Sequence, residues 1–240
     1  MELKKKSWRD VSINEYFDLK EKLDDTTLNE YEKEVTKLAF ITEQDEDKIW
    51  SLSINEFRTL QVQSLWMQEF PISDNPKFST IKINKETYNI DTNLQNFTIA
   101  QYIDFQSFYS KRKSNERVLG NILACFIIPK GHKYAEGYDI QELVSTLNNN
   151  LDILTANEIM FFFLKQYLIS IRVLANYFNL MMKRLKKKSK NQEQVKDLEE
   201  HWERMKKATL DGLHSLTTLE NLPETNGMMF SRKTYMSSSI

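Results

Sequence analysis

Few residues of this 240-residue chain have types and spacings that could do chemistry, and they form no recognised catalytic or metal-binding pattern. The three histidines, His132, His201 and His214, lack the spacing of metal ligands and have no cysteine partner. The segment I-P-K-G-H-K at 128–133 lacks the glycine series and the Lys-Ser/Thr ending of a phosphate-binding loop. We therefore expect no catalytic residues, no metal ligands and no cofactor, and a protein that is not an enzyme.

Two further candidates have simple structural interpretations. The single cysteine, Cys125, excludes an internal disulfide, and its setting in I-L-A-C-F-I predicts a buried, inert thiol. The acidic stretch E-Q-D-E-D at 43–47 could hold a divalent cation, but its spacing fits no calcium loop. We interpret it as the first turn of a short helix, where the helix dipole favours anions.

The most concentrated charge is a basic run, K-R-L-K-K-K-S-K at 183–190, in a chain whose net charge is −1. Its six cations are Lys183, Arg184, Lys186, Lys187, Lys188 and Lys190. The run could be a solvated helix end, where cations complement the dipole. It could also contact phosphates or an acidic protein surface. As a partner-binding segment we favour an acidic protein surface, because the net charge of −1 gives the chain no general attraction to nucleic acid.

A long helix at 155–188 is the element around which the rest of the chain is expected to be organised, and the basic run lies at its end. Thr155 and Glu158 predict a capping box, and neither Gly nor Pro follows before residue 188. Its polar residues form one narrow stripe, so its apolar arc is much wider than the roughly 100° of a surface helix. We expect that arc to be shared between the core and an oligomer interface. The candidate interface residues are Phe161, Phe162, Phe163, Tyr167, Phe178 and, on the following helix, Trp202.

Similar start patterns divide the rest of the chain into further helices. They are Ser12/Glu15, Thr27/Glu30, Ser53/Glu56, Thr98/Gln101 and Asp139/Glu142. The Ser53 helix is expected to reach about Phe70, a stripe over 118–126 predicts another helix, and 148–150 is a predicted turn. The near-identical S-I-N-E-Y at 12–16 and S-I-N-E-F at 53–57 could mark a duplication. We favour convergence, because their flanking sequences do not match.

Residues 79–91 switch to an alternating pattern that predicts a β-hairpin with its turn at 84–86. A lone hairpin is barely stable, so it must pack on helices or pair with a strand of another chain. Its edges are candidates for pairing between subunits. The predicted fold is mainly α: a helical domain at 1–188 around one long central helix, with a single inserted hairpin near 79–91.

The remaining residues, 189–240, are expected to form a C-terminal helix and an extended tail. The helix is predicted from an apolar stripe of Val195, Leu198, Trp202, Met205, Leu213 and Leu216. No apolar run approaches the ~20 residues of a membrane span, and no secretory leader is visible. We expect no membrane contact and synthesis in a reducing cytoplasm.

The order of these segments resembles a family of neck and tail ring proteins, described as tail-assembly-chaperone-like, of crAss-like Bacteroides phages. The matching segments are S-W-R-D-V-S-I-N-E-Y (7–16), I-W-S-L-S-I-N-E-F (49–57), I-K-I-N-K-E-T-Y-N-I (81–90), F-T-I-A-Q-Y-I-D-F (97–105), I-L-A-C-F-I-I-P-K-G-H-K-Y (122–134), Y-D-I-Q-E-L (138–143) and T-A-N-E-I-M-F-F-F-L (155–164). The resemblance covers about residues 7–180. It implies a non-enzymatic virion protein that forms a homo-oligomeric ring around a DNA channel, with no catalytic residues.

The resemblance also implies partners and a location. They are other phage neck and tail proteins, transient contact with genomic DNA, and residence in the virion after assembly in the host cytoplasm. An alternative is a cytoplasmic tail-assembly chaperone that is absent from the mature virion. A weaker hypothesis is a regulator that binds nucleic acid through the basic run, since one such run without interleaved aromatic residues rarely confers specificity.

Replacing all six cations of the basic run with Gln is expected to impair particle assembly more than DNA passage. A closed ring multiplies the self-repulsion of the run by the number of subunits, so the cations need acidic neighbours. Electron microscopy can count assembled particles, and a DNA-release assay can measure ejection. Particles that assemble normally and fail only in ejection would contradict this prediction and favour contact with DNA.

Overall fold

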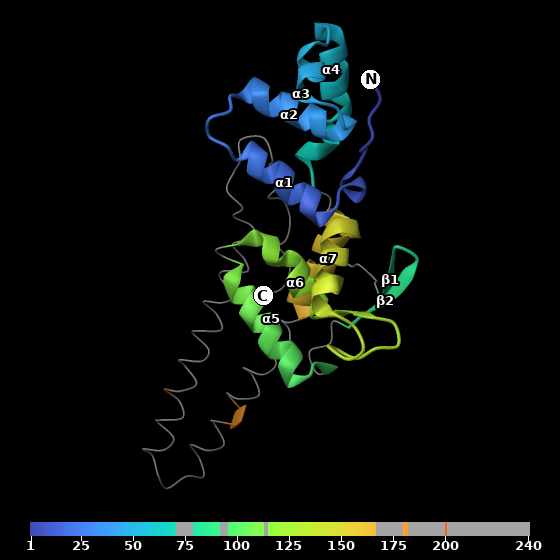
Figure 1. Cartoon of the computed structure of the whole chain (residues 1–240). Coiled ribbons are helices and arrows are strands. Elements are labelled where there is room, and N and C mark those ends of the chain that lie inside the picture. Colours follow the sequence, from blue (N-terminus) through green and yellow to red (C-terminus); the bar gives the residue numbers. More distant parts are fainter. Residues whose placement is uncertain (71–78, 92–95, 113–114, 167–179, 182–199, 201–240) are drawn as a thin grey trace.

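The computed structural model describes residues 1–70, 79–91, 96–112, 115–166, 180–181 and 200. This part of the chain is mainly α-helical with one small antiparallel sheet, as predicted (Figure 1). The expected C-terminal helix and tail at 189–240 lie outside the described residues, apart from residue 200. Of the long helix predicted at 155–188, the structure describes a helix over 153–166 and helical residues at 180–181.

The described helices form two lobes that meet at α1 (Figure 1). The N-terminal lobe, residues 1–70, contains α1 (Ile13–Leu23), α2 (Glu30–Thr42), α3 (Glu46–Trp50) and α4 (Ile54–Gln63). The second lobe, the described residues between 79 and 166, contains β1 (Thr80–Ile83), β2 (Glu86–Ile90), α5 (Ile99–Lys111), α6 (Leu119–Ala124), β3 (Ile127–Pro129), α7 (Ile140–Asn150) and the helix at 153–166. Since α1 packs on α7, the two lobes share one hydrophobic core.

Most of the predicted helix starts are confirmed. Capping boxes occur at Ser12, Ser53 and Thr98, and the Asp139 side chain accepts from the first amides of α7. These side chains satisfy amide groups that the first helical turn leaves unpaired.

Two predicted starts are wrong. The capping box of α2 is formed by Asn29 with Glu32, two residues after the predicted pair. The central helix is capped by Asp152, whose Oδ1 accepts from the Thr155 amide at 2.8 Å. An acidic or amide side chain within three residues of a predicted Thr cap therefore competes for the cap and, in both cases here, takes it.

Three predicted helix boundaries also differ. α4 ends at Gln63 and a separate 3₁₀ helix covers Leu65–Gln68, so the α-helix stops short of Phe70. α6 ends at Ala124, because the chain then enters β3. The predicted turn at 148–150 belongs instead to α7, which continues to Asn150.

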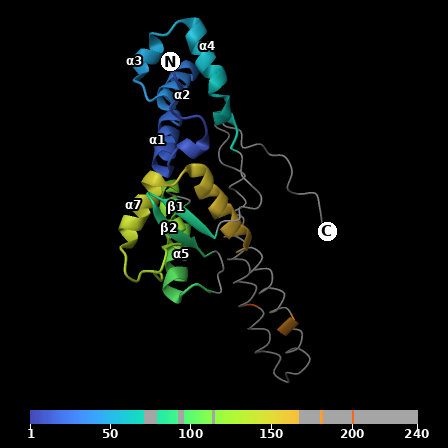
Figure 2. The same ribbon diagram turned by 90° about the vertical axis from the view of Figure 1, so that its right-hand side faces the viewer.

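The predicted hairpin is confirmed, and the sheet has a third strand that the sequence did not predict. Asn84 and Lys85 both adopt left-handed backbone conformations, which matches the twist of a two-residue hairpin turn. β2 pairs with β1 on one side and with β3 on the other, where Ile90 lies opposite Ile127. The hairpin is thus completed by a strand of its own chain, and β1 lies beside α7 (Figure 2).

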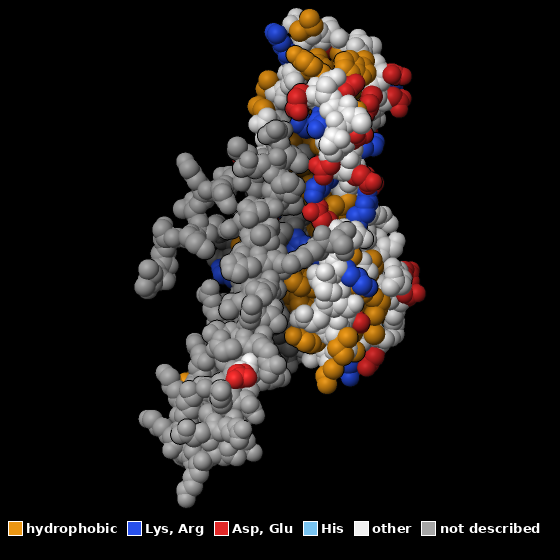
Figure 3. Space-filling view, turned by 90° about the vertical axis from the view of Figure 1, so that its left-hand side faces the viewer, with side chains coloured by type: hydrophobic (Ala, Val, Ile, Leu, Met, Phe, Trp, Pro, Cys, Tyr) orange, Lys and Arg blue, Asp and Glu red, His pale blue; other side chains and the backbone are white. Residues whose placement is uncertain are grey.

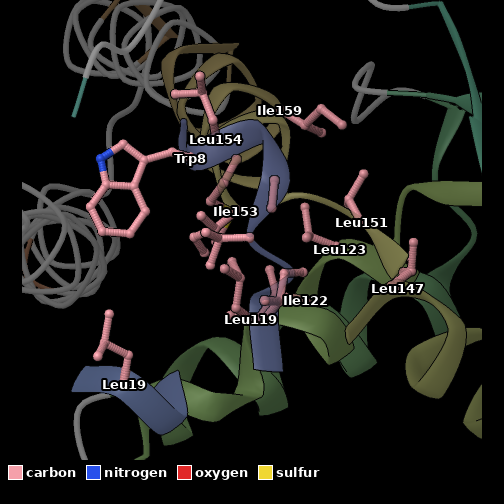
Figure 4. Packing of buried hydrophobic residues seen from close by; sticks show 14 of the residues in the cluster. Trp8, Leu19, Leu119, Ile122, Leu123, Leu147, Leu151, Ile153, Leu154 and Ile159 are labelled. Carbon is pink, nitrogen blue, oxygen red and sulfur yellow. The ribbon is translucent and has the colours of Figure 1, made fainter. Parts of the chain in front are cut away.

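The common core is built where α6, α7 and the start of the helix at 153–166 converge with Trp8 and Leu19 (Figure 4). Gly120 allows the close approach of α6 to α7, since a Cβ there would lie 2.1 Å from the Asn148 Oδ1. Phe163 is fully buried and stacks on Phe126 with ring centroids 4.5 Å apart. It also meets the edge of Phe105 on α5.

The two S-I-N-E copies occupy different environments. Ile13 is fully buried in the common core, whereas Ile54 is 72% exposed on α4. The shared S-I-N-E motif therefore specifies a helix start in both places, but the two copies pack differently. This difference supports convergence over duplication.

Phe163→Ala is expected to lower the free energy of unfolding by about 3–5 kcal/mol, because it leaves a cavity beside the rings of Phe97, Phe105 and Phe126. Phe161→Ala, on the same helix but 40% exposed, is the matched control and should cost about 1 kcal/mol or less. Urea unfolding followed by circular dichroism measures both. Equal losses for the two variants would show that Phe163 does not hold the core.

Candidate interaction surfaces

The junction between the lobes is made by the N-terminal segment against the start of the central helix. The Ile153 amide donates to the Val11 carbonyl at 2.8 Å, and the Ile13 amide donates to the Leu151 carbonyl at 3.2 Å. Val11 and Ile13 are fully buried. Two segments about 140 residues apart in the chain are thereby fixed edge to edge.

Arg9 adds a polar link at the same junction. Its guanidinium donates to the Thr155 hydroxyl at 2.9 Å and lies 3.4 Å from the carboxylate of Glu158. Thr155 and Glu158, predicted as a capping box, therefore serve a long-range contact instead. Glu158 is almost completely buried, so loss of Arg9 would leave a carboxylate without its ionic partner.

A second buried charge, Lys5, joins the N-terminus to the helices of its lobe. Its Nζ lies 2.8 Å from Glu15 and 3.1 Å from Glu43, beside the ring of Phe40. Burial alone would lower the pKa of Lys5, but the hydrogen bonds that its ammonium donates to the two carboxylates outweigh burial, and the pKa is raised. For Glu15, burial opposes ionisation, yet hydrogen bonds from Lys5 and Ser12 lower its pKa.

Exposed ion pairs brace α1 against the second lobe. The Arg117 guanidinium lies 2.7 Å from both Asp18 and Glu21 of α1. Lys20 of α1 pairs with Glu116, the residue next to Arg117. Each such pair contributes little to the free energy of folding. Together they join three residues of α1 to the neighbouring residues Glu116 and Arg117, which fixes the orientation of α1.

In the described part of the chain, the side chains that could take part in chemistry are held in contacts typical of a structural role. Burial raises the pKa of Cys125 to about 12, as expected for an inert thiol. The Tyr134 hydroxyl donates to Asp104 at 2.8 Å, and burial raises the pKa of this tyrosine. Among the described residues no group of His, Cys, Asp and Glu side chains could hold a metal ion. Glu46 of the acidic stretch accepts from Thr36, consistent with a helix start.

An exposed apolar surface lies on α4 and the residues that flank it. We call it the α4 surface, and it consists of Trp50, Ile54, Val62 and Leu65. Ile54 and Val62 are 72% and 67% exposed, and the spacing of eight residues places them on the same side of α4. The inner side of α4 carries the buried Leu60.

A second exposed apolar surface lies on α5. It consists of Ile99, Tyr102 and Ile103, spaced by three and four residues, and Ile99 is 80% exposed. The opposite side of α5 carries Phe105, which packs on Phe163. Hydrophobic side chains accordingly reach the surface of both lobes (Figure 3).

The structure describes only some of the residues predicted to form an interface. Phe161 is exposed and Phe162 is half-buried. Phe163 is wrong as an interface residue, because its own chain already buries it completely. Tyr167, Phe178 and Trp202, and all six cations of the basic run at 183–190, lie outside the described residues.

Sequence reasoning missed both the α4 surface and the α5 surface. On α5 a usable pattern was present, since Ile99 and Ile103 lie opposite Phe105 and both sides of the helix are apolar. On α4 the apolar residues on the outer side are interrupted by polar ones, so nothing in the spacing distinguished exposed Val62 from buried Leu60.

Comparison with protein-family models, curated proteins and solved structures found no match to the chain. Within the described residues, no helix combines the length and apolar character needed to cross a membrane. The geometry of the two apolar surfaces is therefore the basis for a functional proposal.

Glu15→Gln is expected to lower the free energy of unfolding at pH 7 by about 0.5–1 kcal/mol, because it removes one ionic partner of Lys5 and keeps a capping side chain. The pKa of Glu15 is lowered by folding, so its contribution is present above the ordinary value of 4.5 and is lost as the pH falls. The gap between wild type and variant should shrink in urea titrations below that pH. A gap that stays constant from pH 7 to pH 3 would contradict this role.

Proposed function

We propose that this chain is a non-enzymatic structural subunit of a phage virion that assembles with copies of itself into a ring in the neck or tail, around the DNA channel. The observation that carries the proposal is the presence of two separate exposed apolar surfaces, on α4 of one lobe and on α5 of the other. The segment order that resembles ring proteins of crAss-like phages supplies the virion context.

Two different surfaces on one subunit favour a ring over a symmetric dimer. A two-fold dimer uses the same patch on both partners, whereas head-to-tail contacts use two patches and close into a ring when the rotation permits. The α4 and α5 surfaces belong to different lobes, which suits such a contact (Figure 1). Exposed clusters of this kind in a folded chain mark places where other proteins bind.

Quantitative mass spectrometry of purified virions tests the proposal. A ring subunit should be present in the same number of copies in every particle, and it should remain after nuclease treatment and washing with salt. Its absence from virions, with abundance in infected-cell lysate, would overturn the ring and favour the tail-assembly chaperone. An excess of the chain on host nucleic acid would favour the regulator instead.

Ile99→Asp combined with Ile103→Asp is expected to reduce incorporation into virions several-fold while leaving the fold intact, because both side chains are exposed. Circular dichroism and thermal unfolding check the fold, and virion mass spectrometry checks incorporation. Gln141→Asp combined with Ser145→Asp supplies a control with the same added charge at exposed positions of α7, away from the α5 surface. Incorporation that equals the wild-type level would remove the α5 surface from the interface.

A further inference from the structure

Although the net charge of the chain is small, acidic residues are concentrated near its N-terminus and basic residues near its C-terminus. Residues 1–70 carry 16 Asp and Glu against 10 Lys and Arg. Residues 167–240 carry 8 acidic against 13 basic residues, and residues 71–166 carry 10 of each. The N-terminal lobe is therefore acidic, and the C-terminal region that contains the basic run is its electrostatic complement.

The acidic charge of the N-terminal lobe lies next to its exposed apolar residues. Asp45 and Asp47 are exposed at the start of α3, and Asp47 precedes Trp50 of the α4 surface by one helical turn. Within the part of the chain that the structure describes, neither carboxylate has a cationic partner. The surface thus offers unpaired acidic groups followed by a row of apolar side chains.

The C-terminal sequence carries the matching pattern in the same order. Six cations at 183–190 precede an apolar stripe that begins with Val195, Leu198 and Trp202. Cations can meet Asp45 and Asp47 while the stripe covers the α4 surface. A combined apolar and ionic contact gives affinity from burial and orientation from charge.

We infer that the α4 surface of one copy, with Asp45 and Asp47, binds the basic and amphipathic region at 183–216 of a second copy. The inference rests on the self-assembly of the proposed function and assigns the α4 surface to the C-terminal region of a second copy, so that the α5 surface is left for a separate contact. A second copy is favoured over the same chain because the described pair 180–181 lies at the end of the molecule remote from α4 in both views (Figures 1 and 2). Acceptor and donor are different parts of the chain, so the contact is head-to-tail and can close into a ring.

Charge reversal on either side tests the contact in the full-length chain. One variant carries Asp45→Lys and Asp47→Lys, and the other carries Lys187→Glu and Lys188→Glu. Each variant alone places like charges in the contact, so its self-association, measured by native mass spectrometry and sedimentation velocity, should weaken at least ten-fold. An equimolar mixture of the two should restore association, because every contact between unlike variants again joins opposite charges.

A control variant with Glu136→Lys and Glu142→Lys makes the same change of charge in the second lobe. Glu142 lies in the first turn of α7, as Asp47 does in α3, so the control matches the effect on the helix dipole. It should associate as the wild type does. Thermal unfolding of all variants confirms that each remains folded.

Three outcomes would overturn the inference. The first is unchanged association of both variants, and the second is a mixture that fails to recover. The third is recovery only when all four changes are in one chain, which would place the contact within a single subunit. In each case a wild-type chain that still assembles leaves the proposed ring intact. A wild-type chain that stays monomeric at all concentrations and in virion extracts would count against the proposed function itself.

Discussion

The pairing of the N-terminal segment with the start of the central helix is the constraint on which the other contacts depend. Two backbone hydrogen bonds join Val11 to Ile153 and Ile13 to Leu151. Val11 and Ile13 are fully buried. Closing a loop of about 140 residues costs several kcal/mol of chain entropy. The cost is offset by the apolar burial around Val11 and by the Arg9 links to Thr155 and Glu158. With that junction in place, α1 can pack on α7 and the two lobes share one core.

The sequence predicted the mainly helical fold and the hairpin because both are specified locally. Caps such as Ser12 with Glu15 act within one turn, and the alternation around Asn84 acts within a few residues. The failure at Thr155 is also local, because the nearby Asp152 takes the cap. The failure at β3 has a different cause, since Ile127 is a strand residue only because β2 lies beside it. Local pattern cannot identify a partner that is remote in sequence.

The candidate surfaces were harder to predict than the fold, because exposure depends on what the remaining chain covers. The wide apolar arc predicted for the central helix is divided in the structure: Phe163 belongs to the core, and Phe161 is exposed. Both have the same type and lie on the same helix, so composition alone gave no reason to separate them. The separation follows from α5, whose Phe105 reaches Phe163 and leaves Phe161 uncovered.

Helix surfaces are better suited than the sheet to join copies of this chain. β1 has four residues and β3 has three, and short edge strands offer few free backbone groups for pairing. β3 also ends at Pro129, which has no amide to donate. The α4 surface, by contrast, combines strongly exposed Ile54 and Val62 with nearby carboxylates that lack partners among the described residues. Apolar burial would supply the strength of such a contact, and charge would make its formation sensitive to salt. In the proposed ring, the subunit would therefore remain separate at high ionic strength and assemble where the ionic strength is lower.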